Sequence, residues 1–352
     1  MSDRGPLPQL SGSLLLADGG IETDLIFRQG WDLPSFAAFV LLDDSAGTEA
    51  LRDYYRPYLS IARSAGFGLV LETPTWRAGH DWGDLLGYDT AGLARVNRQG
   101  VQLLSELREE ADTGAVPILI SGCLGPRADA FNAGIVMTAD QALRYHSPQV
   151  QTLESSGTDF VSALTLAYPA EAIGIARSAQ EEGVPVVISF TVETDGRLPN
   201  GSTLEEAVLQ VDEATDGGPA YYMVNCAHFR HLRNTFEANP GAPTAWRSRL
   251  RGVRANASDR SHAQLDAATD LDDGDPARFG DQSAQLLSQL PALMVLGGCC
   301  GTDARHIEAI SRSVLALTDA GVPDSSGPPS KLAARTRTGT GRLQEKQPGQ
   351  GH

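Results

Sequence analysis

Short apolar runs alternate along most of the chain with longer segments of helical period. Each run is followed by a polar or glycine-rich turn. Runs that are apolar throughout are typical of strands covered on both faces of a parallel sheet. We predict eight such strands, at Leu14–Leu16, Gly68–Leu71, Val116–Ile120, Phe160–Leu164, Val184–Phe190, Tyr221–Val224, Leu250–Val253 and Ala292–Leu296.

The segments between these runs have the apolar spacing of amphipathic helices. Thr203 and Glu206 form a capping-box pattern, and Thr302 or Asp303 is placed to cap a last helix through Ala316. Eight strands that alternate with helices predict a (β/α)₈ TIM barrel. The other expected helices are Glu49–Ala65, Thr90–Glu110, Ala139–Ser156, Ala170–Glu182 and Pro276–Leu290.

The chain is expected to form one domain over residues 1–322, because a barrel of this class uses about 250 residues. Residues 323–352 are rich in Gly, Ser, Pro, Thr and basic residues without apolar periodicity, which predicts a disordered tail. The least regular part is 227–249, where Pro240 and Pro243 break any long helix. A doubly wound open sheet is the alternative fold, although no G-x-G-x-x-G sequence follows an early strand.

Composition narrows the class of partner. The 352 residues carry a formal net charge of −16, which disfavours nucleic acids and anionic membranes and favours small-molecule chemistry. The first residues contain only the short apolar piece Leu14–Leu16, far below a signal-peptide core or a membrane span. We therefore expect a cytoplasmic protein.

Polar residues stand where the predicted strands end. A barrel of this type places its chemistry at the carboxyl ends of its strands, so these positions are the candidate site. They read Asp18-Gly19-Gly20, Glu72-Thr73, Ser121-Gly122-Cys123, Thr165, Ser189 with Thr191, Asn225-Cys226, Asn256 and Gly297-Gly298-Cys299-Cys300.

Three of the four cysteines follow strands that are two positions apart around the ring. Cys226 ends the sixth strand, whereas Cys299 and Cys300 end the eighth, so their sulfurs can face one lumen. Thiolates suit zinc, and three protein ligands leave the open position of a catalytic zinc site. Neighbouring residues of a strand point to opposite faces, so both vicinal sulfurs reach one ion only at a turn, which the flanking glycines allow.

Other roles for these residues stay open. Cys226 taken alone is typical of a small buried apolar residue, and a redox pair at Cys299 and Cys300 requires a strained disulfide. Cys123 is interpreted as packing and His228 as a helix-start residue. The remaining histidines considered, His80, His146, His262 and His306, are predicted at the surface.

Six segments, in order from the first strand to the last, resemble one enzyme family, the homocysteine S-methyltransferases, which include the betaine-dependent enzyme and the homocysteine module of cobalamin-dependent methionine synthase. The resemblance implies a Zn²⁺ held by Cys226, Cys299 and Cys300, with the homocysteine thiol as fourth ligand. It also implies methyl transfer from a positively charged donor to give methionine. The segments are LLLADGGIETDL at 14–25, ISGCLGP at 120–126, VISFTV at 187–192, VNCAH at 224–228, RANAS at 254–258 and VLGGCCGTDARHI at 295–307.

Further residues are expected to contact the substrates. For the amino acid end of homocysteine, the resemblance points to Asp18 with the backbone of Gly19 and Gly20, and to Glu22 and Thr23 beside them. Asn225 and Asn256 are expected to orient ligands or loops. An aromatic face suits a sulfonium or quaternary ammonium donor. The aromatic candidates are Trp76, Trp31 and Tyr168.

Two positions depart from the family pattern. Leu164 stands where many members have a Glu that holds the amino group of homocysteine, and Pro74 replaces an Asn. Either Glu72 substitutes for the missing acid or the acceptor differs.

The expected reaction is zinc-dependent methylation of homocysteine by S-methylmethionine or S-adenosylmethionine. The alternatives are another thiol or selenol acceptor, a corrinoid partner protein as methyl source, and a non-catalytic zinc or thiol sensor. The sequence leaves the donor and the oligomeric state undetermined.

Overall fold

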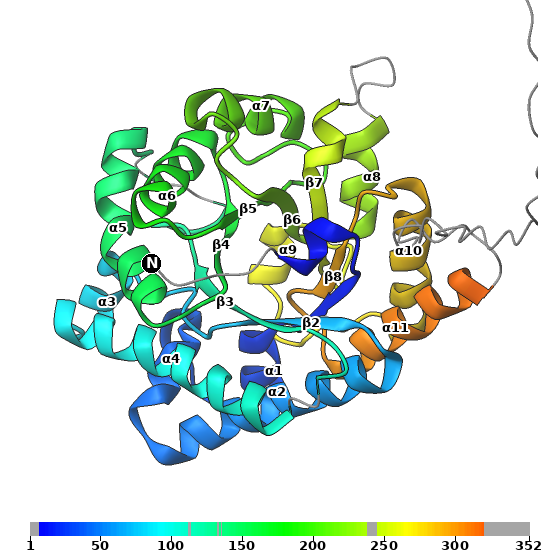
Figure 1. Ribbon diagram of the computed structural model, residues 1–352, viewed down its shortest axis with the longest axis horizontal. Coiled ribbons are helices and arrows are strands. Elements are labelled where there is room, and N and C mark those ends of the chain that lie inside the picture. Colours follow the sequence, from blue (N-terminus) through cyan, green and yellow to red (C-terminus); the bar gives the residue numbers. More distant parts are fainter. Residues whose placement is uncertain (1–6, 112–113, 132–133, 135, 238–244, 320–352) are drawn as a thin grey trace, which may run out of the picture.

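Eight parallel strands form a closed barrel in chain order (Figure 1). The computed structural model describes residues 7–111, 114–131, 134, 136–237 and 245–319. The predicted (β/α)₈ fold is confirmed, and the open-sheet alternative is wrong, because β1 pairs with both β2 and β8. The predicted tail, 323–352, lies outside the described residues. The strands are β1 Leu15–Ala17, β2 Gly68–Glu72, β3 Ile118–Leu124, β4 Phe160–Leu166, β5 Val186–Phe190, β6 Tyr221–Ala227, β7 Leu250–Ala255 and β8 Val295–Gly298.

Helices surround the barrel, as Figure 1 shows. The helices predicted from periodicity all occur, and α8 Phe229–Glu237 begins directly after His228, the expected helix-start residue. The short helices that were not predicted are α1 Ile21–Phe27, α3 His80–Leu86 and α9 His262–Asp266. The longer helices are α2 Ser45–Ala65, α4 Thr90–Ala111, α5 Ala139–Ser155, α6 Pro169–Glu182, α7 Leu204–Thr215, α10 Pro276–Gln289 and α11 Ala304–Asp319. The 3₁₀ segments are η1 Pro8–Ser11, η2 Pro34–Phe36, η3 Ala38–Asp43 and η4 Ala245–Arg249.

The predicted helix starts are built as expected. Thr203 and Glu206 make both hydrogen bonds of a capping box at α7. At α11, Asp303 Oδ1 accepts from the backbone N–H of Arg305 at 2.9 Å, so the side chain of Asp303 caps this helix. Both prolines of the least regular stretch fall in 238–244, outside the described residues.

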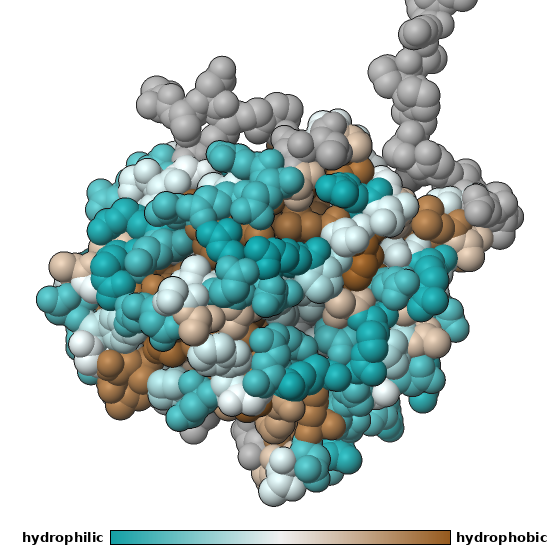
Figure 2. Space-filling model, turned by 90° about the horizontal axis from the view of Figure 1, so that it is seen from below, coloured by the Kyte–Doolittle hydropathy of each residue, from teal (hydrophilic) through white to brown (hydrophobic). Residues whose placement is uncertain are grey.

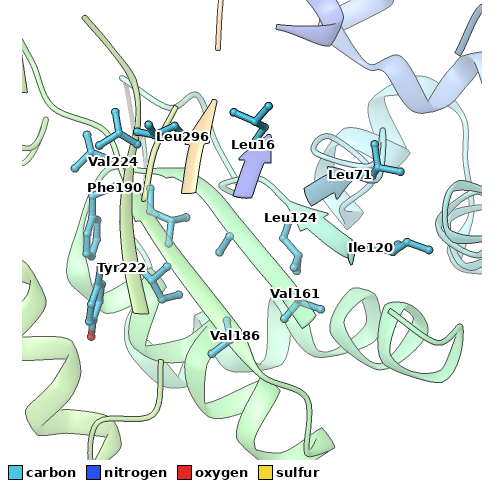
Figure 3. Packing of buried hydrophobic residues seen from close by; sticks show 14 of the residues in the cluster. Leu16, Leu71, Ile120, Leu124, Val161, Val186, Phe190, Tyr222, Val224 and Leu296 are labelled. Atoms are coloured by element: carbon cyan, nitrogen blue, oxygen red, sulfur yellow. The ribbon is translucent and has the colours of Figure 1, made fainter. Parts of the chain in front are cut away.

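The core has two layers. Leu16, Leu71 and the other side chains in Figure 3 belong to a cluster that also contains helix residues, and this cluster fills the space between the barrel and the helices. There Phe190 and Tyr222 stack with ring centres 6.3 Å apart. A second cluster consists almost entirely of alternate strand residues, such as Leu15 and Met223, and fills the lumen. Alternation along each strand therefore assigns its side chains to one layer or the other.

Two histidines predicted at the surface are buried. His146 lies in α5 with its Nε2 3.0 Å from Glu171 Oε1. His306, in α11, contacts Asp303 through Nδ1 at 3.1 Å and the carbonyl of Asp273 through Nε2 at 2.8 Å. The surface prediction is wrong for both because each ring has polar partners inside the protein, whereas His80 is exposed as predicted.

The face of the molecule drawn in Figure 2 is mainly hydrophilic. In the view of Figure 2, hydrophobic residues form separate patches among hydrophilic ones. Within the described part of the chain, no helix combines the length and the apolar character needed to cross a membrane.

Candidate active site

The three predicted cysteines lie together at the carboxyl ends of β6 and β8. Their sulfur atoms are all within 4.8 Å of one another, and Cys226 Sγ is 3.6 Å from Cys300 Sγ. Sulfurs bound to one tetrahedral zinc, each at about 2.3 Å, are separated by ~3.8 Å. The set, completed by Cys299, therefore fits a soft metal ion that prefers thiolates. Cys123 packs in the lumen cluster instead, as predicted.

The backbone turns at both cysteine segments. Cys226 has a φ of 56°, and the pairing of β6 with β7 shifts register between Asn225 and Ala227. After β8, Thr302 N–H donates to the carbonyl of Cys299 at 3.1 Å, and Gly301 has a φ of 80°. The predicted turn at the vicinal pair is present, and a glycine occupies its left-handed position.

A network around Asn225 connects the sixth strand to its neighbours. Asn225 Oδ1 accepts from Thr165 N–H at 2.8 Å and from Ser189 Oγ at 2.6 Å. Its Nδ2 donates to Thr165 Oγ1 at 2.7 Å and lies 3.8 Å from Cys299 Sγ. Thr165 itself has a left-handed φ of 64°, so the amide holds a strained residue of β4 in place.

The cysteines influence one another's ionisation. Hydrogen bonds from Cys226 and Cys300 hold the pKa of Cys299 well below its usual range. The hydrogen bond to Cys299 in turn raises the pKa of Cys226. The lowered pKa favours a thiolate at Cys299, and a cation bound there would favour loss of the remaining protons.

Beside the cysteines, a buried arginine joins two strand ends. Arg254 of β7 forms ion pairs with Asp18 and, from Nη1 to Oε1 at 3.5 Å, with Glu72. Its Nε donates to the carbonyl of Gly298 at 3.1 Å and its Nη2 to that of Gly19 at 3.2 Å. This guanidinium fixes the ends of β1, β2 and β8 relative to β7.

The acids of this region are hard to ionise. Burial raises the pKa of Asp18 to about 6, although Arg254 partly opposes the shift. Burial likewise raises the pKa of Glu72 to about 7 against the effect of Arg254. For Glu22, at the start of α1, burial raises the pKa to about 7. These carboxyl groups therefore change charge near neutral pH.

A cavity of about 350 Å³ connects these groups. Asn256 is not among its lining residues; it is buried, and its N–H donates to the carbonyl of Ala227 at 3.1 Å. Trp31 and Tyr168 do not line it either, which leaves Trp76 as the predicted aromatic group at the cavity. The predicted site residues that line it are Asp18, Gly19, Gly20, Glu22, Thr23, Glu72, Trp76, Asn225, Cys226, Cys299 and Cys300.

The lining residues that were not predicted include Arg254, Arg77, Phe131 and His262. Arg254 lies within the RANAS segment, but its acidic partners are remote in sequence. His262, predicted at the surface, has its Nε2 3.0 Å from the carbonyl of Cys226 and stacks on Phe131, so that prediction is wrong. No sequence pattern predicts that the rings of His262 and Phe131 stack on each other.

An eight-stranded barrel with thiols and buried acids around one cavity at its strand ends defines a barrel enzyme that acts on a small molecule. The sequence model of homocysteine S-methyltransferase matches residues 15–314. The chain belongs to this family, and it is a methyltransferase of the homocysteine class. The predicted family and enzyme class are thereby confirmed.

Individual relatives agree with this assignment. The chain is 25% identical over 354 residues to methionine synthase of Mycobacterium leprae, covering 91% of the chain but only 26% of that protein, so it spans about a quarter of this relative. The metallated form of the homocysteine methyltransferase MmuM from Escherichia coli has a TM-score of 0.65 at 20% identity, covering 86% of this chain and 96% of that one. Its oxidized form has a TM-score of 0.66 at 21% identity, with the same coverage. These structures share the fold.

Proposed function

We propose that the chain transfers a methyl group from a sulfonium donor, S-methylmethionine or S-adenosylmethionine, to the thiol of homocysteine, and that Cys226, Cys299 and Cys300 hold a zinc ion for this reaction. The observation that carries the proposal is the approach of three sulfurs to within 4.8 Å at the wall of the cavity. Zinc bound there supplies an open position for the acceptor thiol and lowers its pKa.

Glu72 and Asp18 bind the ammonium group of homocysteine in this proposal. Glu72 Oε2 is buried and accepts no hydrogen bond among the described residues, so it has capacity for a donor. The carboxyl group lies at the end of β2 on the cavity wall, which Leu164 also lines. Glu72 can therefore take over the role of the acid that Leu164 replaces in the family pattern.

The backbone of the glycine turn after β1 lies close to the cysteine turn after β8. A Cβ on Gly20 would lie 2.4 Å from the carbonyl oxygen of Cys299, an approach that only glycine permits. Thr23 fixes this contact, because its Oγ1 donates to the carbonyl of Gly20 at 2.9 Å and accepts from Gly301 N–H at 3.1 Å. Gly19, Gly20 and Thr23 thus position the acceptor, with Glu22 beside them.

The methyl transfer itself needs orientation rather than a general base. The acceptor sulfur forms a bond to the methyl carbon while the bond between that carbon and the donor sulfur breaks. The electron pair of the broken bond stays on the donor sulfur, so the sulfonium becomes a neutral thioether. The acceptor proton leaves to solvent. Asp18, Glu22 and Glu72 make their part of the wall acidic, which suits a cationic donor.

The test is metal analysis of the purified protein followed by a panel of methyl donors with homocysteine, scored by methionine formation. About one zinc per chain and methionine from a sulfonium donor are expected. Cys299→Ala and Cys300→Ala should lose both metal and turnover, whereas Cys123→Ala serves as the matched cysteine control and should keep its metal. Full zinc and activity in Cys300→Ala would refute the ligand assignment.

Two other outcomes would change the proposal. Methionine formed only on addition of a methylated corrinoid protein would replace the sulfonium donor, and zinc binding without any methylation would favour a sensor. The cytoplasmic location remains a prediction from the sequence.

A further inference from the structure

Arg77 is a buried cation in the wall of the same cavity. It follows β2 in the loop before α3, and it is only 6% exposed. Its guanidinium carbon lies 4.1 Å from the ring centre of Trp76 and 3.7 Å from that of Trp82. The two indoles hold the guanidinium through its faces and leave its edges for hydrogen bonds.

Only some of the N–H donors on the edges of the Arg77 guanidinium have hydrogen-bond partners. Nη1 donates to the carbonyl of Ala128 at 3.1 Å, and Nη2 is 4.0 Å from Asp129 Oδ2, too far for a hydrogen bond. Nε is buried and has no hydrogen-bond partner among the described residues. The side chain of Asp129 is 55% exposed, so its charge is well solvated.

Arg254, the other buried arginine of this cavity, has closer acidic partners than Arg77, although its Nη1 also has no hydrogen-bond partner among the described residues. It pairs with two buried carboxyl groups, Asp18 and Glu72, and donates to backbone carbonyls as well. Burial lowers the pKa of Arg77 to about 10, which still leaves it charged at neutral pH. A buried guanidinium with an unpaired edge is costly unless an anion completes it. The cavity therefore has a place for a negative group beside Arg77.

We propose that Arg77 binds the carboxylate of the methyl donor, an inference that rests on the proposed function. The Nε and Nη2 edge matches a carboxylate through two parallel hydrogen bonds. Trp76, the aromatic candidate for the onium group, is the preceding residue, and its Nε1 donates to the carbonyl of Leu164 at 3.3 Å, which fixes the ring. In this proposal the onium group of one zwitterionic donor contacts Trp76, and its carboxylate binds the next residue, Arg77.

The carboxylate bound by Arg77 in this proposal belongs to the methyl donor and not to homocysteine. Its thiol belongs at the cysteine cluster and its ammonium group at Asp18 and Glu72, which Arg254 links to the end of β8. Arg77 instead contacts Trp82 of α3 and Ala128 of the loop after β3, and of the acids assigned to the acceptor only the charge of Glu22 acts on its pKa. We therefore expect the enzyme to prefer onium donors that carry a carboxylate.

The experiment compares S-methylmethionine with its α-carboxamide at saturating homocysteine. The native enzyme should prefer the carboxylate by about 10- to 100-fold in kcat/KM, the value of a charge-assisted bond. In Arg77→Gln this preference should fall to within about twofold while the KM for homocysteine stays unchanged. Arg77→Lys should keep part of the preference, because it keeps the charge without the planar fork.

Arg127→Gln is the matched control. Arg127 also lies over an aromatic ring, that of Tyr145, and pairs with Asp81 at 2.6 Å, but it does not line the cavity. This variant should keep the native preference. A native enzyme that uses both donors equally would overturn the proposal. So would an Arg77→Gln variant whose homocysteine KM rises while its donor preference persists, since Arg77 would then serve the acceptor.

A binding measurement separates this proposal from the proposed function. Tryptophan fluorescence reports equilibrium binding beside Trp76 and Trp82 without turnover. If no donor methylates homocysteine, the proposed function fails, yet tighter binding of S-methylmethionine than of its amide, lost in Arg77→Gln, would still support the carboxylate site. Equal binding of the two compounds to the native protein would refute it. Should Arg77→Gln not fold, Arg77→Lys tests the same site, and its preference for S-methylmethionine should then be reduced rather than lost; an undiminished preference would refute the proposal.

Discussion

Asn225 Nδ2 lies 3.8 Å from Cys299 Sγ, and the same nitrogen donates to Thr165 Oγ1 at 2.7 Å. One amide therefore contacts the thiol that most readily ionises and also a residue of β4 in a left-handed conformation. The position of the cysteine cluster depends on polar contacts across β4, β5 and β6, as well as on the turn that carries the vicinal pair.

Replacing Asn225 with Ala should weaken metal binding by about 10- to 100-fold, the usual effect of removing a group that orients a ligand. The free energy of unfolding should fall by about 1–3 kcal/mol, because Thr165 N–H loses its buried acceptor. Zinc competition with a chromophoric chelator and urea denaturation measure the two effects. Ser189→Ala removes one bond to the same amide and is the control. If Asn225→Ala lost stability but bound zinc with native affinity, the role of Asn225 would be limited to folding.

Arg254→Met should destabilise the protein by about 3–5 kcal/mol at pH 8, since it leaves Asp18 and Glu72 buried without their cation. The loss should be smaller at pH 5. The folded-state pKa values of both acids are raised above their unfolded values, so the folded state binds more protons between about pH 4 and 7 and protonation relieves the uncompensated charge. Urea denaturation of both proteins at the two pH values checks this. A loss that is independent of pH would assign Arg254 a packing role.

The fold and the grouping of three cysteines could be predicted from the sequence because their signals are local. Each strand is one apolar run, and the cysteines follow directly after two of them. Arg254 was missed because its partner Asp18 is 236 residues away and only barrel closure brings the two together. Arg77 was missed for a similar reason: burial of a charged side chain between two indoles leaves no periodic pattern. Asn256 was expected to orient ligands or loops; it is buried outside the cavity lining, and its N–H donates to the carbonyl of Ala227, a contact between two strand ends.

Trp76→Ala should raise the donor KM by about 5- to 30-fold and change the homocysteine KM less than twofold, because the lost ring faces the onium group in the proposed complex. Initial rates with each substrate varied in turn measure this. Trp82→Ala is the matched control, as Trp82 covers the other face of Arg77 but does not line the cavity, and its effect should be smaller. Equal effects of Trp76→Ala on both substrates would remove Trp76 from the donor site.

The KM for homocysteine should fall as the pH rises from 6 to 8. Burial raises the pKa of Glu72 to about 7, so the carboxylate that attracts an ammonium group forms in that interval, and substrate binding strengthens as the proton leaves. Glu72→Gln should have a KM that is at least tenfold higher at pH 8 and changes little above pH 7, with a remaining dependence near pH 6 from Asp18.

A second variant tests whether Glu72 takes the place of the acid missing at 164. Leu164 and Glu72 line the same cavity, so a carboxylate at position 164 can serve the same ammonium group. Leu164→Glu added to Glu72→Gln should recover part of the homocysteine affinity, whereas Leu164→Gln, which has the same size without the charge, should not. A Glu72→Gln variant with native KM throughout the pH range would exclude Glu72 from amino-group binding. The acceptor would then be a thiol recognised without its ammonium group.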